Sequence, residues 1–252
     1  MPENTELQIR HVLLGFGAAG CSQPTLSRVV SLAARLRASI QNIYVEEPDL
    51  ARLAALPFTR EVARYTARIR RLDANLLARR LHARAEELNV LLQQQAQLEA
   101  IESSFRTLQG ELIPTILREA GDASVIIIPA QSNWRDIAGE TATARISVAA
   151  LYDGSEQAAR ALSLAATLAE KDAGDLLVLI TDLRFRNEVS SSSGKQPVRF
   201  SLIDGTDEQG ILNRISMIHP RLLIISADTS LGRSALHIRE LTRRGIDLVM
   251  VK

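Results

Sequence analysis

The short turn Asp153-Gly154-Ser155 directly follows an apolar run and has residue types that could do chemistry. A carboxylate and a hydroxyl at the end of a buried strand can face a ligand, because open α/β sheets bind ligands beyond the carboxyl ends of their strands. The same residues can also serve the fold alone, with Asp153 or Ser155 as the N-cap of a following helix. The motif is short, and this favours the cap over a ligand-facing turn.

The remaining reactive side chains do not form a catalytic or metal-binding set. The four histidines lack metal-ligand spacing, and His237 with Glu240 would supply only two ligands. The single cysteine, Cys21, excludes an internal disulfide, and no His or second Cys neighbours it in the sequence to activate it. A nucleophile elbow of the G-x-S-x-G kind is absent from the sequence. We therefore expect no metal and no enzymatic activity.

The turn belongs to a strand–helix–strand unit. Residues 146–151 and 176–180 are apolar and predict two buried strands. Between them, a helical face is predicted by the spacing of Ala158, Ala161, Leu162, Ala165 and Leu168. A crossover of this length between two buried strands predicts a right-handed βαβ unit of a parallel sheet.

An earlier stretch, residues 9–45, repeats this plan at similar spacing. Residues 9–16 predict a buried strand, helix signals begin near Ser22, and residues 39–45 predict the next strand. An internal repeat of this size outweighs any single motif in the sequence. We therefore divide the chain into a first unit, residues 1–144, and a second unit, residues 145–252.

The two copies end differently. In the second copy, the strand at residues 222–226 is followed by a helix and a final strand, residues 247–251. In the first copy, only residues 129–145 separate the equivalent strand from the second copy, which leaves no room for both elements. The first copy is therefore predicted to lack its last helix and strand. Exposed sheet edges are normally covered, so we expect the long Arg-rich helix or a second subunit to cover this one.

That Arg-rich stretch, residues 59–96, lacks Gly and Pro and predicts one bent helix or two helices in sequence. Its arginines do not share one face and are interrupted by acidic residues, which favours a solvated helix over a nucleic-acid contact. Its apolar stripe has a 3-4 spacing that suits helix–helix packing. We therefore expect a homodimer contact there.

The net charge and the apolar runs of the chain do not indicate binding to nucleic acid or to a membrane. The net charge is +1, so no bulk field attracts nucleic acid or a membrane surface. No apolar run approaches the roughly 20 residues that span a bilayer, and residues 1–8 are acidic and polar, unlike a signal peptide. We expect a cytoplasmic protein without membrane insertion.

With these residues in view, the chain resembles the universal stress protein family in a tandem, two-copy form. The stretch ISVAALYDGSEQAARALSLAATLAE is similar to that family's first strand, acidic turn and first helix, and SALHIRELTRRGIDLVMVK to its closing helix and strand. In the first copy, IRHVLLGFGAAGCSQPTLSRVVSLAARL matches in pattern. The resemblance implies a stress-response role and Rossmann-like α/β units with parallel sheets of strand order 3-2-1-4-5.

A subset of that family binds ATP, and this sequence departs from their pattern. Those members resemble one another in an Asp after strand 1 and a G-x2-G-x9-G-[ST] stretch after strand 4. In the first copy Phe16 stands at the Asp position, and PAQSNWRDIAGETATAR has one glycine, Gly139. In the second copy Asp153 is kept, but SADTSLGRSALHIRE has only Gly232. A full phosphate cradle is therefore not expected in either copy.

A reduced nucleotide site in the second copy is the candidate that the resemblance leaves. It would place Asp153 near a base or ribose and Gly232 near a phosphate of ATP or AMP. Its candidate residues are Asp153, Gly154, Ser155, Ser226, Gly232, Arg233 and Ser234.

We predict a non-catalytic stress-response or regulatory protein that acts through homodimerisation and a protein partner, with degenerate nucleotide-binding motifs and no nucleic-acid binding. The alternative is a nucleotide sensor for ATP or AMP that uses the second copy alone.

Overall fold

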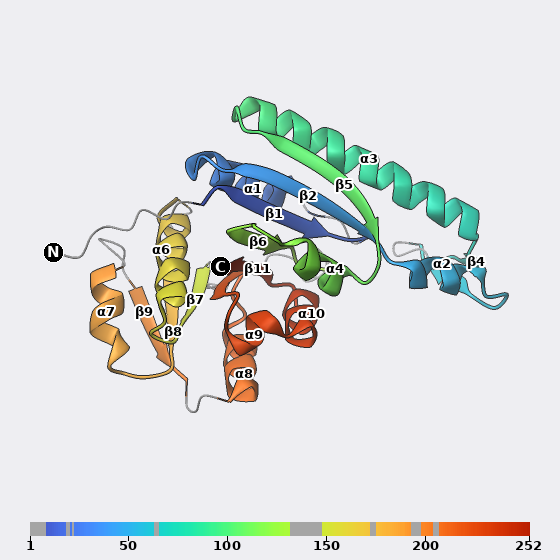
Figure 1. Cartoon of the computed structure of the whole chain (residues 1–252). Coiled ribbons are helices and arrows are strands. Elements are labelled where there is room, and N and C mark those ends of the chain that lie inside the picture. The colour runs from blue at the N-terminus through green and yellow to red at the C-terminus, as the bar shows by residue number, and fades with distance from the viewer. Residues whose placement is uncertain are drawn as a thin grey trace.

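One mostly parallel sheet passes through the computed structural model (Figure 1), which describes residues 9–18, 21, 23–62, 66–131, 148–171, 175–192, 198–203 and 207–252. The sheet has nine strands in the order β5-β2-β1-β6-β11-β10-β7-β8-β9. The strands are β1 (His11–Phe16), β2 (Ser39–Glu46), β5 (Ser103–Gln109), β6 (Val125–Ile128), β7 (Val148–Tyr152), β8 (Leu176–Ile180), β9 (Val198–Leu202), β10 (Leu222–Ser226) and β11 (Asp247–Val251).

Helices cover both faces of this sheet. One face packs against α1 (Gln23–Arg35), α3 (Ala74–Leu98), α6 (Glu156–Lys171) and α7 (Phe185–Ser192). The other face packs against α4 (Leu112–Glu119), α8 (Glu208–Ile218), α9 (Ser230–Arg233) and α10 (Ala235–Arg243). Because both faces are covered, β6, β7, β8 and β11 are buried along their whole length and read as continuous apolar runs. None of the described helices is long and apolar enough to cross a membrane.

The strand order follows the predicted repeat. Strands β9-β8-β7-β10-β11 give the order 3-2-1-4-5, and β5-β2-β1-β6 give 3-2-1-4 with no fifth strand among the described residues. The predicted α/β class with a mostly parallel, Rossmann-like sheet is therefore confirmed, whereas the division into two copies and the missing last strand of the first copy stay predictions. Residues 132–147, which contain most of the loop between the copies, lie outside the described residues.

The open edge of the first copy is covered by β11, so the expectation of the Arg-rich helix or a second subunit was wrong. Strand β11 pairs in parallel with β10 and antiparallel with β6, with Val249 opposite Ile127. Each of these two strands would otherwise be a sheet edge, and pairing them satisfies both ladders at once. The junction is closed at its end by Lys252, whose Nζ donates to the carbonyl oxygens of Ala120 (3.1 Å) and Gly121 (2.6 Å).

The Arg-rich stretch does not form the long helix that was predicted from residue 59. It begins as a two-stranded hairpin of β3 (Arg60–Val62) and β4 (Ile69–Arg71), and α3 starts only at Ala74. The carboxylate of Asp73 accepts hydrogen bonds from the Asn75 and Leu76 amides (2.9 and 3.0 Å) and caps α3. The short helix α2 (Pro48–Ala55) and the hairpin project from one end of the sheet (Figure 1).

The apolar stripe of α3 packs within its own chain. Ala85, Leu88, Leu92 and Ala96 are buried there. The side chains of Ser27 and Ser31 on α1 bond to Gln95 (3.4 Å) and Glu99 (3.1 Å) at the end of α3. The later part of the predicted stripe is therefore buried inside the chain, whereas its start at Val62 and Ile69 is exposed on the hairpin. The homodimer stays a prediction.

Candidate functional site

The candidate residues lie at the carboxyl ends of two neighbouring strands, β7 and β10. These strands pair in parallel with Leu222 opposite Val148 and Ile224 opposite Ala150. Asp153 directly follows β7, and Ser226 ends β10, so both lie at the same edge of the sheet. The structure thus places the turn after β7 beside the loop after β10, as a site for one ligand would require.

The turn itself is bonded internally. The Asp153 carboxylate accepts the Ser155 amide (3.0 Å), and the Ser155 hydroxyl accepts the Ala158 amide (3.1 Å) as the N-cap of α6. Gly154 has φ of +83°, and a Cβ there would meet the Phe185 ring at 2.5 Å. Phe185 therefore closes over the turn from α7.

Tyr152 holds this aromatic lid in place. Its ring meets Phe185 edge to face, with centroids 5.5 Å apart. Its hydroxyl donates to Glu188 (3.1 Å), which is also on α7. Burial raises the pKa of the Tyr152 hydroxyl, and the bond to Glu188 raises it further. Tyr152 thus acts as a neutral donor that fixes α7 against the end of β7.

The loop after β10 also satisfies its own polar groups. The buried Ser226 accepts the Asp228 amide through Oγ (3.1 Å) and the Thr229 hydroxyl through its carbonyl oxygen (2.8 Å). Thr229 Oγ1 in turn accepts the Gly232 amide (3.1 Å). Arg233 pairs with Asp228 at 3.1 Å. These bonds take up the amides and the guanidinium that a phosphate would need.

Gly232 is required by packing of the backbone. A Cβ there would lie 2.6 Å from the Ser226 carbonyl oxygen and 2.8 Å from that of Ala227. Ser234 then caps α10 by accepting the His237 amide (3.4 Å). Both residues were candidates for phosphate contact, but each makes a contact that the fold itself needs.

The equivalent place in the first copy is an aromatic cluster. Phe16, which stands at the position of the family's Asp, is buried. Its ring lies 5.9 Å from that of Tyr44 and 6.2 Å from that of Phe105, measured between centroids. The Phe16 ring, unlike the carboxylate at this position in the family's pattern, offers no group that hydrogen-bonds a ribose.

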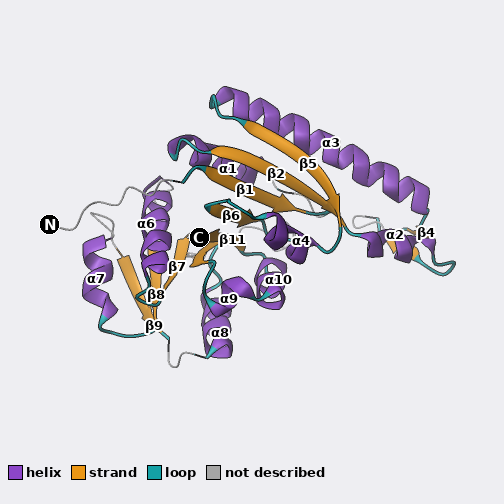
Figure 2. Cartoon of the chain, viewed as in Figure 1, coloured by secondary structure: helices purple, strands orange, loops and turns teal. Residues whose placement is uncertain are grey.

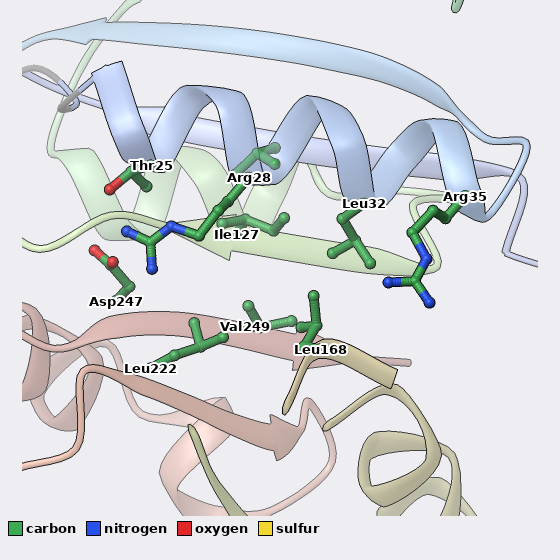
Figure 3. A pocket seen from close by; sticks show the side chains of 10 residues that line it. Thr25, Arg28, Leu32, Arg35, Ile127, Leu168, Leu222, Asp247 and Val249 are labelled. Atoms are coloured by element: carbon green, nitrogen blue, oxygen red, sulfur yellow. The ribbon is translucent and has the colours of Figure 1, made fainter. Parts of the chain in front are cut away.

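A pocket that no sequence motif indicated lies between α1 and α6, above β6, β11 and β10 (Figure 3). Its floor is apolar, with Arg28 and Asp247 at one end and Arg35 at the other. Arg35 donates to the Thr167 carbonyl oxygen of α6 (3.4 Å), and Asp247 accepts the Ala130 amide (2.9 Å). Its volume of about 40 Å³ holds two or three water molecules at roughly 15 Å³ each. Sequence analysis missed it because its lining comes from distant segments.

Metal binding has no support among the described residues, where no group of three His, Cys, Asp or Glu side chains is placed to hold an ion. The described part of the site therefore offers capped helices, an aromatic lid and two exposed carboxylates, those of Asp153 and Asp228.

No protein-family model matches the sequence, and no curated protein matches it. Among solved structures, the chain is similar to a universal stress protein from Archaeoglobus fulgidus DSM 4304, with 15% identity, a TM-score of 0.48 and 96% of each chain covered. A universal stress protein in complex with cAMP is 18% identical with a TM-score of 0.33, over 44% of this chain and 99% of that chain.

A third similar structure is MurG from Acinetobacter baumannii, with 15% identity and a TM-score of 0.26 over 92% of this chain and 75% of that one. All three TM-scores lie below 0.5, so these similarities carry no argument about ligand or function.

Proposed function

We propose that this chain is a non-catalytic regulatory protein of the universal stress type, with units at residues 1–144 and 145–252, which acts by binding other proteins. The strand orders 3-2-1-4 and 3-2-1-4-5 support the family assignment. They agree with the sequence resemblance, which rests on the turn after β7 and on the closing helix and strand.

The observation that carries the proposal is the internal bonding of the candidate nucleotide site. Ser155 and Ser234 cap helices, Thr229 holds the Gly232 amide, and the Phe185 ring lies against Gly154. These contacts satisfy the polar groups of the turn and of the loop without a ligand. Each cap contributes about 1 kcal/mol to the stability of the fold.

The alternative is a sensor for ATP or AMP that uses the second unit alone. One observation favours it. The Asp153 carboxylate is exposed, and among the described residues it accepts a hydrogen bond only from the Ser155 amide of its own turn. It lies at the sheet edge where ligands bind in open α/β folds.

Turnover of ATP tests the non-catalytic part of the proposal. The full chain with Mg²⁺ and ATP should release phosphate no faster than buffer alone. Release that scales with protein concentration and falls in Asp153→Ala would contradict the proposal. Asp122→Ala, which removes an exposed carboxylate elsewhere in the chain, is the matched control.

A further inference from the structure

An arm of the molecule, residues 48–80, projects from the β5 end of the sheet and consists of α2, the β3–β4 hairpin and the start of α3 (Figures 1 and 2). Its sequence has eight arginines against three acidic residues, a net charge of +5, whereas the whole chain has +1. The arm therefore concentrates positive charge that the remainder of the chain offsets.

The hairpin has two unlike faces. Alternate residues of a strand point to opposite sides, and β3 pairs with β4 so that Arg60 lies opposite Arg71 and Val62 opposite Ile69. These two pairs share one face, the outer face of the hairpin. On the other face, Glu61 forms ion pairs with Arg70 and with Arg80 of α3, the latter at 3.7 Å.

Like charges stand directly opposite each other on the outer face. The Leu72 amide donates to the Thr59 carbonyl oxygen (3.1 Å), so the next pair, Arg60 and Arg71, is of the non-hydrogen-bonded kind, in which Cα atoms lie about 4.5 Å apart. Like charges at such positions destabilise a hairpin. In the described part of the chain, neither arginine has an acidic partner.

The arm also carries apolar side chains that are exposed to solvent. Val62 is 63% exposed, Ile69 62%, and Phe58, just before β3, 75%. On α2, Leu53 is 52% exposed. On the outer face itself, the exposed Val62–Ile69 pair lies beside the Arg60–Arg71 pair, and a contiguous exposed apolar group of this kind is typical of a binding surface.

Charge decides between occupants of this face. A second copy would bring arginine against arginine, so the outer face is not self-complementary. Arginine side chains are longer than those of Val62 and Ile69, so a lipid surface would meet the guanidinium groups before the apolar side chains reached its acyl region. A protein segment that carries both acidic and aliphatic side chains can contact the Arg60–Arg71 pair and the Val62–Ile69 pair at the same time.

The backbone favours an extended segment. In a non-hydrogen-bonded pair the amide and carbonyl groups point away from the partner strand, so those of residues 60, 62, 69 and 71 point to the outer edges of the hairpin. A strand added at such an edge would place one side chain next to the Arg60–Arg71 pair. The side chain two residues later would then lie next to the Val62–Ile69 pair.

We propose that the outer face of this hairpin binds an extended segment of a partner protein with an acidic residue two positions from an aliphatic one. This rests on the proposed function and names the class of partner.

Fluorescence anisotropy with a synthetic peptide tests the proposal on the full chain. The probe is a labelled nine-residue peptide in which Glu and Val alternate at every second position, with Ser between them. The control peptide has the same composition with Glu and Val adjacent, so that they point to opposite sides. We expect saturable binding of the probe and about tenfold weaker binding of the control, because cross-strand pairs contribute up to about 1 kcal/mol each.

Charge reversal tests the residues. Arg60→Glu/Arg71→Glu should weaken probe binding at least about tenfold, whereas Arg118→Glu/Arg243→Glu, which reverses two exposed arginines outside the arm, should leave it unchanged. The single change Arg71→Glu separates folding from binding. It sets opposite charges across the hairpin and should raise thermal stability while it weakens probe binding.

Four results would overturn the proposal. They are equal binding of the two peptides, absence of saturable binding at millimolar peptide, capture by phosphatidylserine vesicles without peptide binding, and a dimer that Arg60→Glu/Arg71→Glu dissociates. Failure here leaves the ATP turnover result untouched, so the loss of this partner class and the loss of the non-catalytic function are distinguishable.

Discussion

At the scale of single residues, the hydroxyl of Tyr44 is a weak point of the first unit. The residue is fully buried at the end of β2, and its hydroxyl has no hydrogen-bond partner in the described part of the chain. A buried unsatisfied hydroxyl costs about 1 kcal/mol or more. Tyr44→Phe should therefore raise the free energy of unfolding by about that amount, measured by urea denaturation.

Tyr152→Phe is the matched control, because that hydroxyl donates to Glu188 at 3.1 Å. Its removal should lower the free energy of unfolding by about 1 kcal/mol. A loss of stability in Tyr44→Phe as large as in Tyr152→Phe would show that Tyr44 does have a partner.

Gly232 is the residue whose role distinguishes packing from phosphate binding. Gly232→Ala would drive a Cβ to within 2.6 Å of a backbone oxygen, and overpacking of this kind costs about 1–3 kcal/mol. Thermal unfolding without nucleotide should show the loss. Gly17→Ala, whose Cβ would make ordinary contacts from 3.5 Å, should be near neutral, and equal tolerance of both changes would refute the packing role.

Residue types alone could predict the candidate positions but not their use. The sequence left Ser155 open between a cap and a ligand contact, and the structure shows the cap. Gly232 was consistent with a phosphate loop, because the sequence does not distinguish a glycine that approaches a phosphate from one that packs against a carbonyl oxygen. Phe185 comes from α7, a separate element, so no local pattern indicated that it lies over Gly154.

At the scale of elements, the start of α3 depends on one carboxylate. The Leu76 amide, followed by that of Asn75, holds the pKa of Asp73 below its ordinary value of 3.8. Because the pKa of Asp73 is lowered in the folded state, the cap stabilises α3 at pH values above the ordinary pKa. This stabilisation is lost as the pH falls through the lowered pKa. Amide exchange at Asn75 and Leu76 should therefore accelerate in Asp73→Ala at neutral pH, and in the parent chain only in strong acid.

The amide of Gly210 provides the internal reference. It is held by Asp207 at the start of α8 (3.2 Å) and should not change in Asp73→Ala. Unchanged exchange at Asn75 and Leu76 would mean that Asp73 does not cap α3.

Helix α3 also shows where the sequence misled. The spacing of Val62 and Ile69 fits a helical stripe, but these residues lie opposite each other across a hairpin. Both side chains are exposed, so their spacing does not reflect a buried face. For this reason the spacing does not distinguish a helix from a strand. From Asp73 onward a cap and a buried face exist, and there the predicted helix is confirmed.

At the scale of the whole molecule, the two halves are joined through β11. Because this strand pairs with both β10 and β6, the chain should unfold in one calorimetric transition. Met250→Ala, at a fully buried position of β11, should lower the stability of the entire chain by about 3 kcal/mol. Two transitions, with only one shifted by the substitution, would show that the halves are independent.

The internal repeat was sufficient to predict the order of the strands in the described sheet. It could not predict which strand pairs with β6. The sequence of β11 is apolar on both faces, and this is expected both for a strand at a sheet edge and for one that connects two sheets. The antiparallel pairing of β6 with β11 follows from closing two edges together, which is a property of the assembled sheet.

The second unit satisfies the polar groups of its candidate nucleotide site with helix caps and covers the turn with the Phe185 ring. Titration of the full chain with ATP and AMP by calorimetry is the first measurement to make. We expect no saturable heat at millimolar nucleotide. Saturable binding at one site per chain, weakened by Asp153→Ala and unchanged by Asp122→Ala, would refute this expectation and establish the second unit as a nucleotide sensor.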